Sequence, residues 1–106
     1  MVKDYKTLPL PSTASLRAFE ASSRLLSFTK AANELSQTQG AISHQIRDLE
    51  SRLDQQLFNR LPKGITLTGA GRQYLPYARE ALEMLYEAER AMRSQNREDV
   101  LSLIHI

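Results

Sequence analysis

The sequence predicts a mainly α-helical fold in which three helices and a two-stranded hairpin precede one long helix. Three observations support this prediction. Apolar residues recur every three or four positions through much of the first half of the chain, which is the spacing of a helix with one buried face. A β-prone segment centred on Pro62-Lys63-Gly64 then interrupts that spacing. A final stretch rich in Ala, Leu, Glu and Arg resumes it as far as about Ser94.

Composition allows one domain plus an extension in 106 residues, and a hydrophobic content of 42% supports a real core. The formal net charge is only +2, but the charges are unevenly distributed. Residues 24–72 hold seven Lys or Arg against four Asp or Glu, whereas residues 73–99 hold four against six. The basic excess therefore lies in the middle of the chain, and the pI near 9.2 weakly favours a nucleic-acid partner.

Several function classes find no support in the sequence. The chain has no cysteine, and its two histidines lie far apart, so we expect neither a disulfide framework nor a metal site or other cofactor. Asp48, Glu50 and Asp54 lie close together, but a solvated charged face explains them better than a catalytic pair. We expect a protein that is not an enzyme. No apolar run reaches signal-peptide or membrane-span length, so a cytoplasmic location is expected, with no membrane partner.

Residues 1–11 read as a loose N-terminal arm that ends with Pro9 and Pro11. Ser12 or Ser15 can cap the first helix, which is expected to run to about Leu25 or Leu26.

Two helical patterns follow with only a short break between them. The first covers 29–35 and can be capped by Ser27 or Thr29; the second starts at Gln39 after a cap at Thr38. The second helix is expected to run from Gln39 to about Leu57, and its residues 39–53 form the candidate reading segment. Its apolar stripe contains Ala41, Ile42, Ile46, Leu49 and Leu53, and the opposite face carries Gln39, Ser43, His44, Arg47 and Asp48. This is the plan of a helix-turn-helix DNA reader, although an ordinary helical hairpin would give a similar pattern.

A hairpin directly after these helices completes a winged helix-turn-helix over residues 12–68. Its turn is bracketed by Arg60 and Lys63, which a wing at 59–68 would place against phosphates or in a minor groove. A solvated hairpin that only closes the core is the alternative, and its apolar residues fit that role. These are Leu57, Phe58, Ile65 and Leu67.

Thr68 can cap the long helix, expected over 69–95, in which Pro76 should kink the helix or mark its first turns. Its apolar surface is wider than one small domain can bury, so we expect it to pair with a second copy. The residues expected in the pairing surface are Leu75, Ala78, Leu82, Leu85 and Met92. The alternative is a helix packed wholly on its own domain. Residues 96–106, with their apolar end, are expected to be a truncated or disordered tail.

The segment from Leu16 to Ala78 resembles the N-terminal domain of LysR-type transcriptional regulators. The resemblance rests on fixed spacings that run from the paired alanines of the second helix to the start of the long helix. These are Ala31-Ala32, Gln39, Ala41-Ile42-Ser43, Gln45-Ile46, Leu49-Glu50, Leu57-Phe58, Arg60 and Leu67-Thr68-Gly69-Ala70-Gly71. Within the family, the sequence is most similar to activators of glycine-cleavage genes and regulators of β-lactamase genes. The chain departs from the pattern at Gly40, His44 and Asp54, where many relatives have Pro, Arg and Gly.

The resemblance implies roles for individual residues. Gln39, Ser43 and His44 match positions that face bases or phosphates, and Arg47 can reach either. The remaining DNA-binding positions are Thr29, Thr38, Arg60 and Lys63: two threonines at helix starts that meet phosphate, the wing arginine near a minor groove, and the lysine of the hairpin turn.

The implied function is a sequence-specific, double-stranded-DNA-binding transcription regulator that acts as a homodimer, with no effector site in this fragment. The alternative is a helical interaction module that dimerises through residues 74–92 without touching DNA; salt-dependent DNA binding would separate the two.

Overall fold

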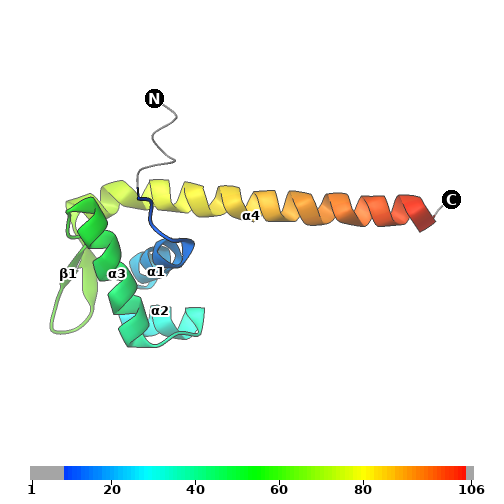
Figure 1. Cartoon of the computed structure of the whole chain (residues 1–106). Helices are drawn as coiled ribbons and strands as arrows, with labels where there is room; N and C mark the ends of the chain where they lie inside the picture. Colours follow the sequence, from blue (N-terminus) through cyan, green and yellow to red (C-terminus); the bar gives the residue numbers. More distant parts are fainter. Residues whose placement is uncertain (1–8, 105–106) are drawn as a thin grey trace, which may run out of the picture.

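The computed structural model describes the backbone of residues 9–104 and the side chains of residues 9–95. A compact head sits at one end of a long projecting helix (Figure 1), and the molecule measures 64 × 38 × 20 Å. The elements, in chain order, are α1 (Thr13–Leu25), α2 (Phe28–Leu35), α3 (Gln39–Leu53), β1 (Phe58–Arg60), β2 (Ile65–Leu67) and α4 (Gly69–Ile104). The predicted mainly α fold, with a winged helix-turn-helix and a long helix, is confirmed. Residues 1–8, which make up most of the predicted arm, lie outside the described part.

Hydroxyl side chains define where the first three helices begin. Ser12, Ser27 and Thr38 each accept a hydrogen bond from the backbone N–H three residues later, at 3.1, 3.1 and 3.0 Å. Such caps satisfy one of the N–H groups that a helix start leaves unpaired. The predicted start of α3 at Gln39 is confirmed, and Ser12 and Ser27 are the caps used where the sequence left two choices open.

The same three helices end at residues in the left-handed conformation: Leu26, Ser36 and Asp54, with φ of 52°, 56° and 53°. Asp54 closes α3 at Leu53, so the extension of this helix toward Leu57 is wrong. Aspartate tolerates this conformation better than most residues that carry a side chain. A turn in the conformation that favours glycine is therefore formed here with aspartate.

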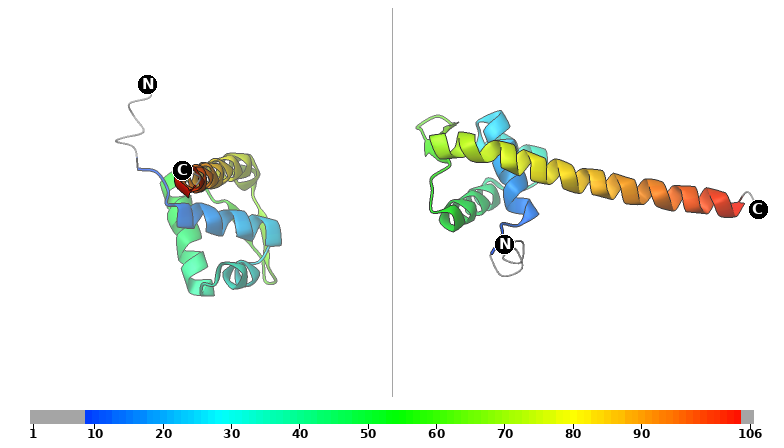
Figure 2. Two further views of the ribbon diagram at one scale, coloured as in Figure 1. Left: turned by 90° about the vertical axis from the view of Figure 1, so that its right-hand side faces the viewer. Right: turned by 90° about the horizontal axis from the view of Figure 1, so that it is seen from above.

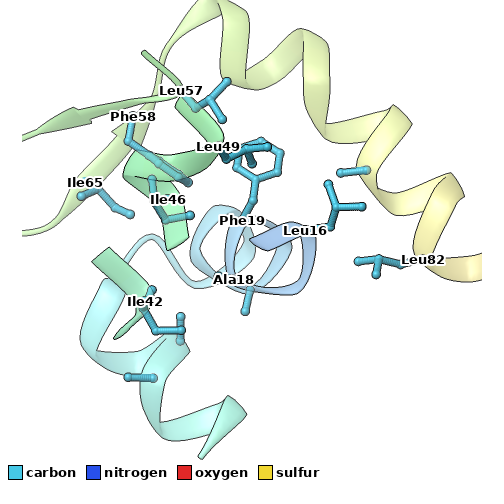
Figure 3. Close-up of a cluster of buried hydrophobic side chains, with 14 residues drawn as sticks. Leu16, Ala18, Phe19, Ile42, Ile46, Leu49, Leu57, Phe58, Ile65 and Leu82 are labelled. Carbon is cyan, nitrogen blue, oxygen red and sulfur yellow. The ribbon is translucent and has the colours of Figure 1, made fainter. Parts of the chain in front are cut away.

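The core forms where α1, α3 and the hairpin meet (Figure 3). Phe19 of α1 and Ile46 of α3 are fully buried, and the ring of Phe58 lies 5.6 Å from that of Phe19. Ala31 and Ala32 are buried at the crossing of α2 with its neighbours. Small side chains there let the helices approach closely.

The hairpin is antiparallel, with Phe58 opposite Leu67 and Arg60 opposite Ile65. Its turn is closed by the Leu61 N–H, which donates to the Gly64 carbonyl at 3.0 Å, and Gly64 has a φ of 89° that favours glycine. The predicted wing is confirmed.

Helix α4 begins after Thr68, whose hydroxyl accepts from the Gly71 N–H at 3.0 Å. It lies across α1 and then leaves the head (Figure 2). The helix continues through Pro76 to Ile104, so the expected end near Ser94 is wrong, as is a structureless tail over 96–104. Residues 95–104 contain no Gly or Pro that would stop a helix. His105 and Ile106 lie outside the described part.

Candidate nucleic-acid interface

Helix α3 has a buried side and a polar side, and the polar side forms a continuous stripe. Ile42, Ile46 and Leu49 are fully buried against the head. Gln39 and Arg47 are exposed on the other side, with Ser43 half-buried between them. A spacing of four residues places these three side chains one above the other along the helix. The stripe can therefore be presented to a long, straight partner.

The start of α2, the stripe of α3 and the wing enclose one open groove. Thr29, Gln39, Ser43, Arg47 and Arg60 all line it, so five of the predicted DNA-binding residues come together from three elements. The Thr29 hydroxyl lies 3.1 Å from Gln39 Oε1 and donates to it across the turn between the two helices. Figure 1 shows α2, α3 and the hairpin gathered at this end of the head.

The other three predicted residues surround the groove without lining it. The Thr38 hydroxyl accepts the capping hydrogen bond of α3, so its oxygen has a structural role. His44 is exposed on α3 next to Ser43, and Lys63 is exposed in the turn of the wing. All three remain accessible to a partner that extends beyond the groove.

Arg60, the arginine of the wing, is held in place by two neighbours. The Arg60 Nη2 atom lies 3.2 Å from Glu50 Oε1, and the Arg60 guanidinium carbon lies 5.6 Å from the centre of the Phe28 ring. A guanidinium above an aromatic face is attracted by the negative face of the ring. The Arg60 side chain is 38% exposed, so part of it stays open to the groove.

Glu50 is the residue whose role the sequence analysis missed. The expected solvated face is wrong for this carboxylate, because its side chain is only 12% exposed. Its Oε2 accepts hydrogen bonds from the Leu57 and Phe58 N–H groups at 2.8 and 3.4 Å, while its Oε1 pairs with Arg60. The available signal was its position seven residues after Ser43, which continues the polar stripe toward the wing.

A second charged cluster lies where α1, α2 and α4 meet, away from the groove. Arg24 pairs with both Glu20 and Glu34, and Arg79 approaches Glu20 to 3.8 Å. The hydrogen bond from Arg24 lowers the pKa of Glu34, and the two carboxylates raise the pKa of Arg24. Because these contacts connect three helices, we assign the cluster a structural role.

The long helix leaves several large apolar side chains exposed in the single chain. They are Tyr77, Met84, Leu85, Tyr86 and Met92. Ala78 and Leu82, in contrast, are 1% and 8% exposed and belong to the core of their own domain. The expectation that these two lie in a pairing surface is therefore corrected: they face α1, whereas Leu85 and Met92 remain free.

Within the described residues, no group of three or more His, Asp or Glu side chains is placed to hold a metal ion. None of the helices in the described part of the chain is both long enough and apolar enough to cross a bilayer.

A three-helix head with an exposed polar helix and a basic hairpin beside it defines a winged helix-turn-helix of the DNA-reading type. The family model for "Bacterial regulatory helix-turn-helix protein, lysR family" matches residues 13–72. The chain belongs to this family, which confirms the resemblance seen in the sequence.

Curated relatives agree with this assignment. Over 94 residues the chain is 46% identical to the HTH-type transcriptional activator AmpR of Pseudomonas aeruginosa and 40% identical to the glycine cleavage system transcriptional activator of Escherichia coli. In both cases the match covers 89% of this chain and 31% of the relative. The chain thus spans about a third of the length of these relatives.

Solved structures share the fold. The DNA-binding domain of CbnR in complex with DNA superposes with a TM-score of 0.74 at 31% identity, covering 78% of this chain and 95% of that one. The BenM DNA-binding domain on its catB site 1 DNA gives the same TM-score and identity, with 78% and 93% covered. Oxidized OxyR of Corynebacterium glutamicum gives 0.81 at 29% identity, covering 85% and 28%.

Proposed function

We propose that this chain is the DNA-binding part of a transcription regulator that recognises specific sites in double-stranded DNA. The observation that carries the proposal is the groove in which Thr29, Gln39, Ser43, Arg47 and Arg60 converge from α2, α3 and the wing. A major groove about 12 Å wide admits one α-helix, and α3 has the exposed polar stripe that such a helix needs. The solved DNA complexes of CbnR and BenM support this role.

The geometry supports different DNA contacts for the residues of α3 and for those of the wing. Gln39, Ser43 and His44 read base edges in the major groove, because they lie in the first part of α3, where recognition helices contact bases. Arg47 reaches a base or a phosphate. Arg60 enters or borders the adjacent minor groove.

Three further residues lie beside the DNA backbone in this proposal: Thr29 and Thr38 at two helix starts and Lys63 at the tip of the wing. The Thr38 hydroxyl and the Lys63 ammonium donate to phosphates and fix the register of the protein on the duplex, whereas the single hydroxyl proton of Thr29 is donated to Gln39 Oε1.

The proposed functional unit is a homodimer joined through α4. Tyr77, Met84 and Met92 are 68%, 67% and 58% exposed in the single chain, which is unusual for large apolar side chains so close in sequence. A second copy would cover them and would hold two α3 helices at a fixed separation. The DNA site would then have two half-sites about one turn of the DNA helix apart, or a multiple of that distance. We place the protein in the cytoplasm and assign it no enzymatic activity.

The test is selection of bound sequences from a random DNA pool, followed by titration of the selected site at several salt concentrations. We expect an enriched motif with two-fold symmetry, and we expect the logarithm of the affinity to fall linearly with the logarithm of the salt concentration, because binding releases counterions from the phosphates. A chain that dimerises but enriches no sequence would instead be an interaction module, and the proposal would be wrong.

A further inference from the structure

An acidic residue continues the DNA-facing stripe of α3. Gln39, Ser43, Arg47 and Glu50 follow at steps of four, four and three residues, so Glu50 lies on the same side of the helix as the groove. A carboxylate at such a place repels phosphates unless a cation neutralises it. Its ion pair within the described residues is with Arg60, at 3.2 Å.

The two oxygens of Glu50 have separate partners. Oε2 accepts from the backbone N–H of Leu57 at 2.8 Å and of Phe58 at 3.4 Å, which fixes the root of the wing against α3. Oε1 accepts from Arg60, two residues further along β1. One carboxylate therefore connects the reading helix, the backbone of the wing and the side chain of the wing arginine.

The opposite side of Arg60 is also fixed. Its guanidinium lies over the Phe28 ring at 5.6 Å, and that ring packs edge-on against Phe58 with centroids 5.5 Å apart. A free arginine has many rotamers, and ordering them on binding costs affinity. Arg60 is already ordered between Glu50 and Phe28, yet it still lines the groove and has five N–H donors, most of which the Glu50 contact leaves for DNA.

From this geometry we propose that Glu50 is a positioning residue for DNA recognition: it holds the wing and pre-orients Arg60 for the groove of the DNA. This inference rests on the proposed function above. The expected change in DNA affinity on neutralising Glu50 is opposite to the one that simple charge repulsion gives. Removing a negative charge from a DNA-facing surface ordinarily strengthens binding, whereas neutralising Glu50 weakens it, because the order of Arg60 is lost.

The experiment is a double-mutant cycle on the 106-residue chain, with the site selected from the random pool as the probe. Glu50→Gln keeps a carbonyl oxygen for the Leu57 N–H but removes the charge that holds Arg60. We expect Glu50→Gln to weaken binding about fivefold in the wild-type background, an effect within the range by which contacting residues couple. When Arg60 is already alanine, Glu50→Gln should leave binding unchanged or strengthen it, because the carboxylate that it removes is then without its Arg60 partner and repels phosphates.

Asp48→Asn is the matched control. Asp48 is on the same helix and is paired with Arg52, outside the groove, so its neutralisation should change affinity equally with Arg60 or Ala at position 60. Circular dichroism melts check that every variant is folded. An effect of Glu50→Gln that is the same in both backgrounds, or that strengthens binding in the wild-type background, would overturn the role of Glu50.

A second measurement needs no variant. Side-chain relaxation by nuclear magnetic resonance on the free wild-type chain should show the Arg60 Nε–H bond more ordered than that of Arg47, for which the described residues provide no ion pair. Equal mobility of the two side chains would contradict pre-orientation. If the wild-type chain selects no DNA, the proposed function fails and this role with it; if it binds and the cycle shows no coupling, only the role of Glu50 fails.

Discussion

Thr29 and Gln39, the second residue of α2 and the first of α3, are joined by a hydrogen bond of 3.1 Å from the threonine hydroxyl to Gln39 Oε1. The contact crosses the turn of the helix-turn-helix and orients the amide of Gln39, which lines the groove. With Oε1 fixed in this way, the amide NH2 group is the part of Gln39 that can be offered to a base acceptor.

Replacing Gln39 by alanine should therefore remove preference at one base position. The expected loss of discrimination is about 1–3 kcal/mol at that position, the usual cost of one mismatched base pair in a recognition site. Binding of Gln39→Ala to the selected site and to its single-base variants measures the effect. A uniform loss across all variants would mean that Gln39 binds without reading sequence. Thr29→Val is the companion variant: it removes the orienting hydroxyl and should weaken the same base preference without abolishing binding.

The sequence predicted those parts of this site that depend on local chemistry. Candidate hydroxyl caps at each helix start and a single apolar stripe on α3 were enough to place the helices and the turn between them, although the structure decided for Ser12 over Ser15 and for Ser27 over Thr29. Pro62-Lys63-Gly64 was enough to place the wing.

What the sequence could not predict depends on contacts between distant segments. The burial of Glu50 requires the loop after α3 to return so that the Leu57 and Phe58 N–H groups face it, and no local pattern encodes that return. The end of α3 depended on Asp54 taking a conformation usually left to glycine. The burial of Leu82 depended on the line along which α4 crosses α1.

The wing should contribute a salt-dependent part of the affinity. Arg60→Ala is expected to weaken binding to all sequences and to reduce the slope of log affinity against log salt by about one unit, as loss of one phosphate-neutralising charge does. Arg52→Ala is the control, because Arg52 pairs with Asp48 and the Leu10 carbonyl and does not line the groove. An unchanged slope for Arg60→Ala would place this arginine outside the interface.

Two glycines at the start of α4 give opposite expectations. A Cβ on Gly71 would lie 2.2 Å from the Leu57 carbonyl oxygen and 2.8 Å from a methyl carbon of Leu67, whereas a Cβ on Gly69 would meet nothing within 4 Å. Gly71→Ala should therefore destabilise the fold by at least about 2 kcal/mol, since the close atom is backbone and cannot move away cheaply. Gly69→Ala should be neutral or stabilise by up to about 1 kcal/mol. The free energies of unfolding of the two variants, measured in urea, test this difference. Equal stabilities would refute the tight packing of α4 against Leu57 and Leu67.

The proposed dimer is best tested on two leucines of α4 that lie three residues apart. Leu82 is 8% exposed and packs in the core of its own domain, while Leu85 is 48% exposed. A glutamate at position 82 should unfold or destabilise the chain by more than about 3 kcal/mol, because it removes core packing and buries a charge. A glutamate at position 85 should leave the fold intact and separate the two copies.

Sedimentation equilibrium with circular dichroism distinguishes these outcomes. We expect the wild-type chain to sediment as a dimer and Leu85→Glu to sediment as a folded monomer. That monomer should bind a two-half-site DNA at least about tenfold more weakly, because each copy then binds without the effective concentration provided by its partner. Glu83→Gln, a change at another exposed position of the same helix, should remain dimeric. A wild-type chain that stays monomeric well above the concentrations at which it binds DNA would show that α4 does not join two copies of this chain.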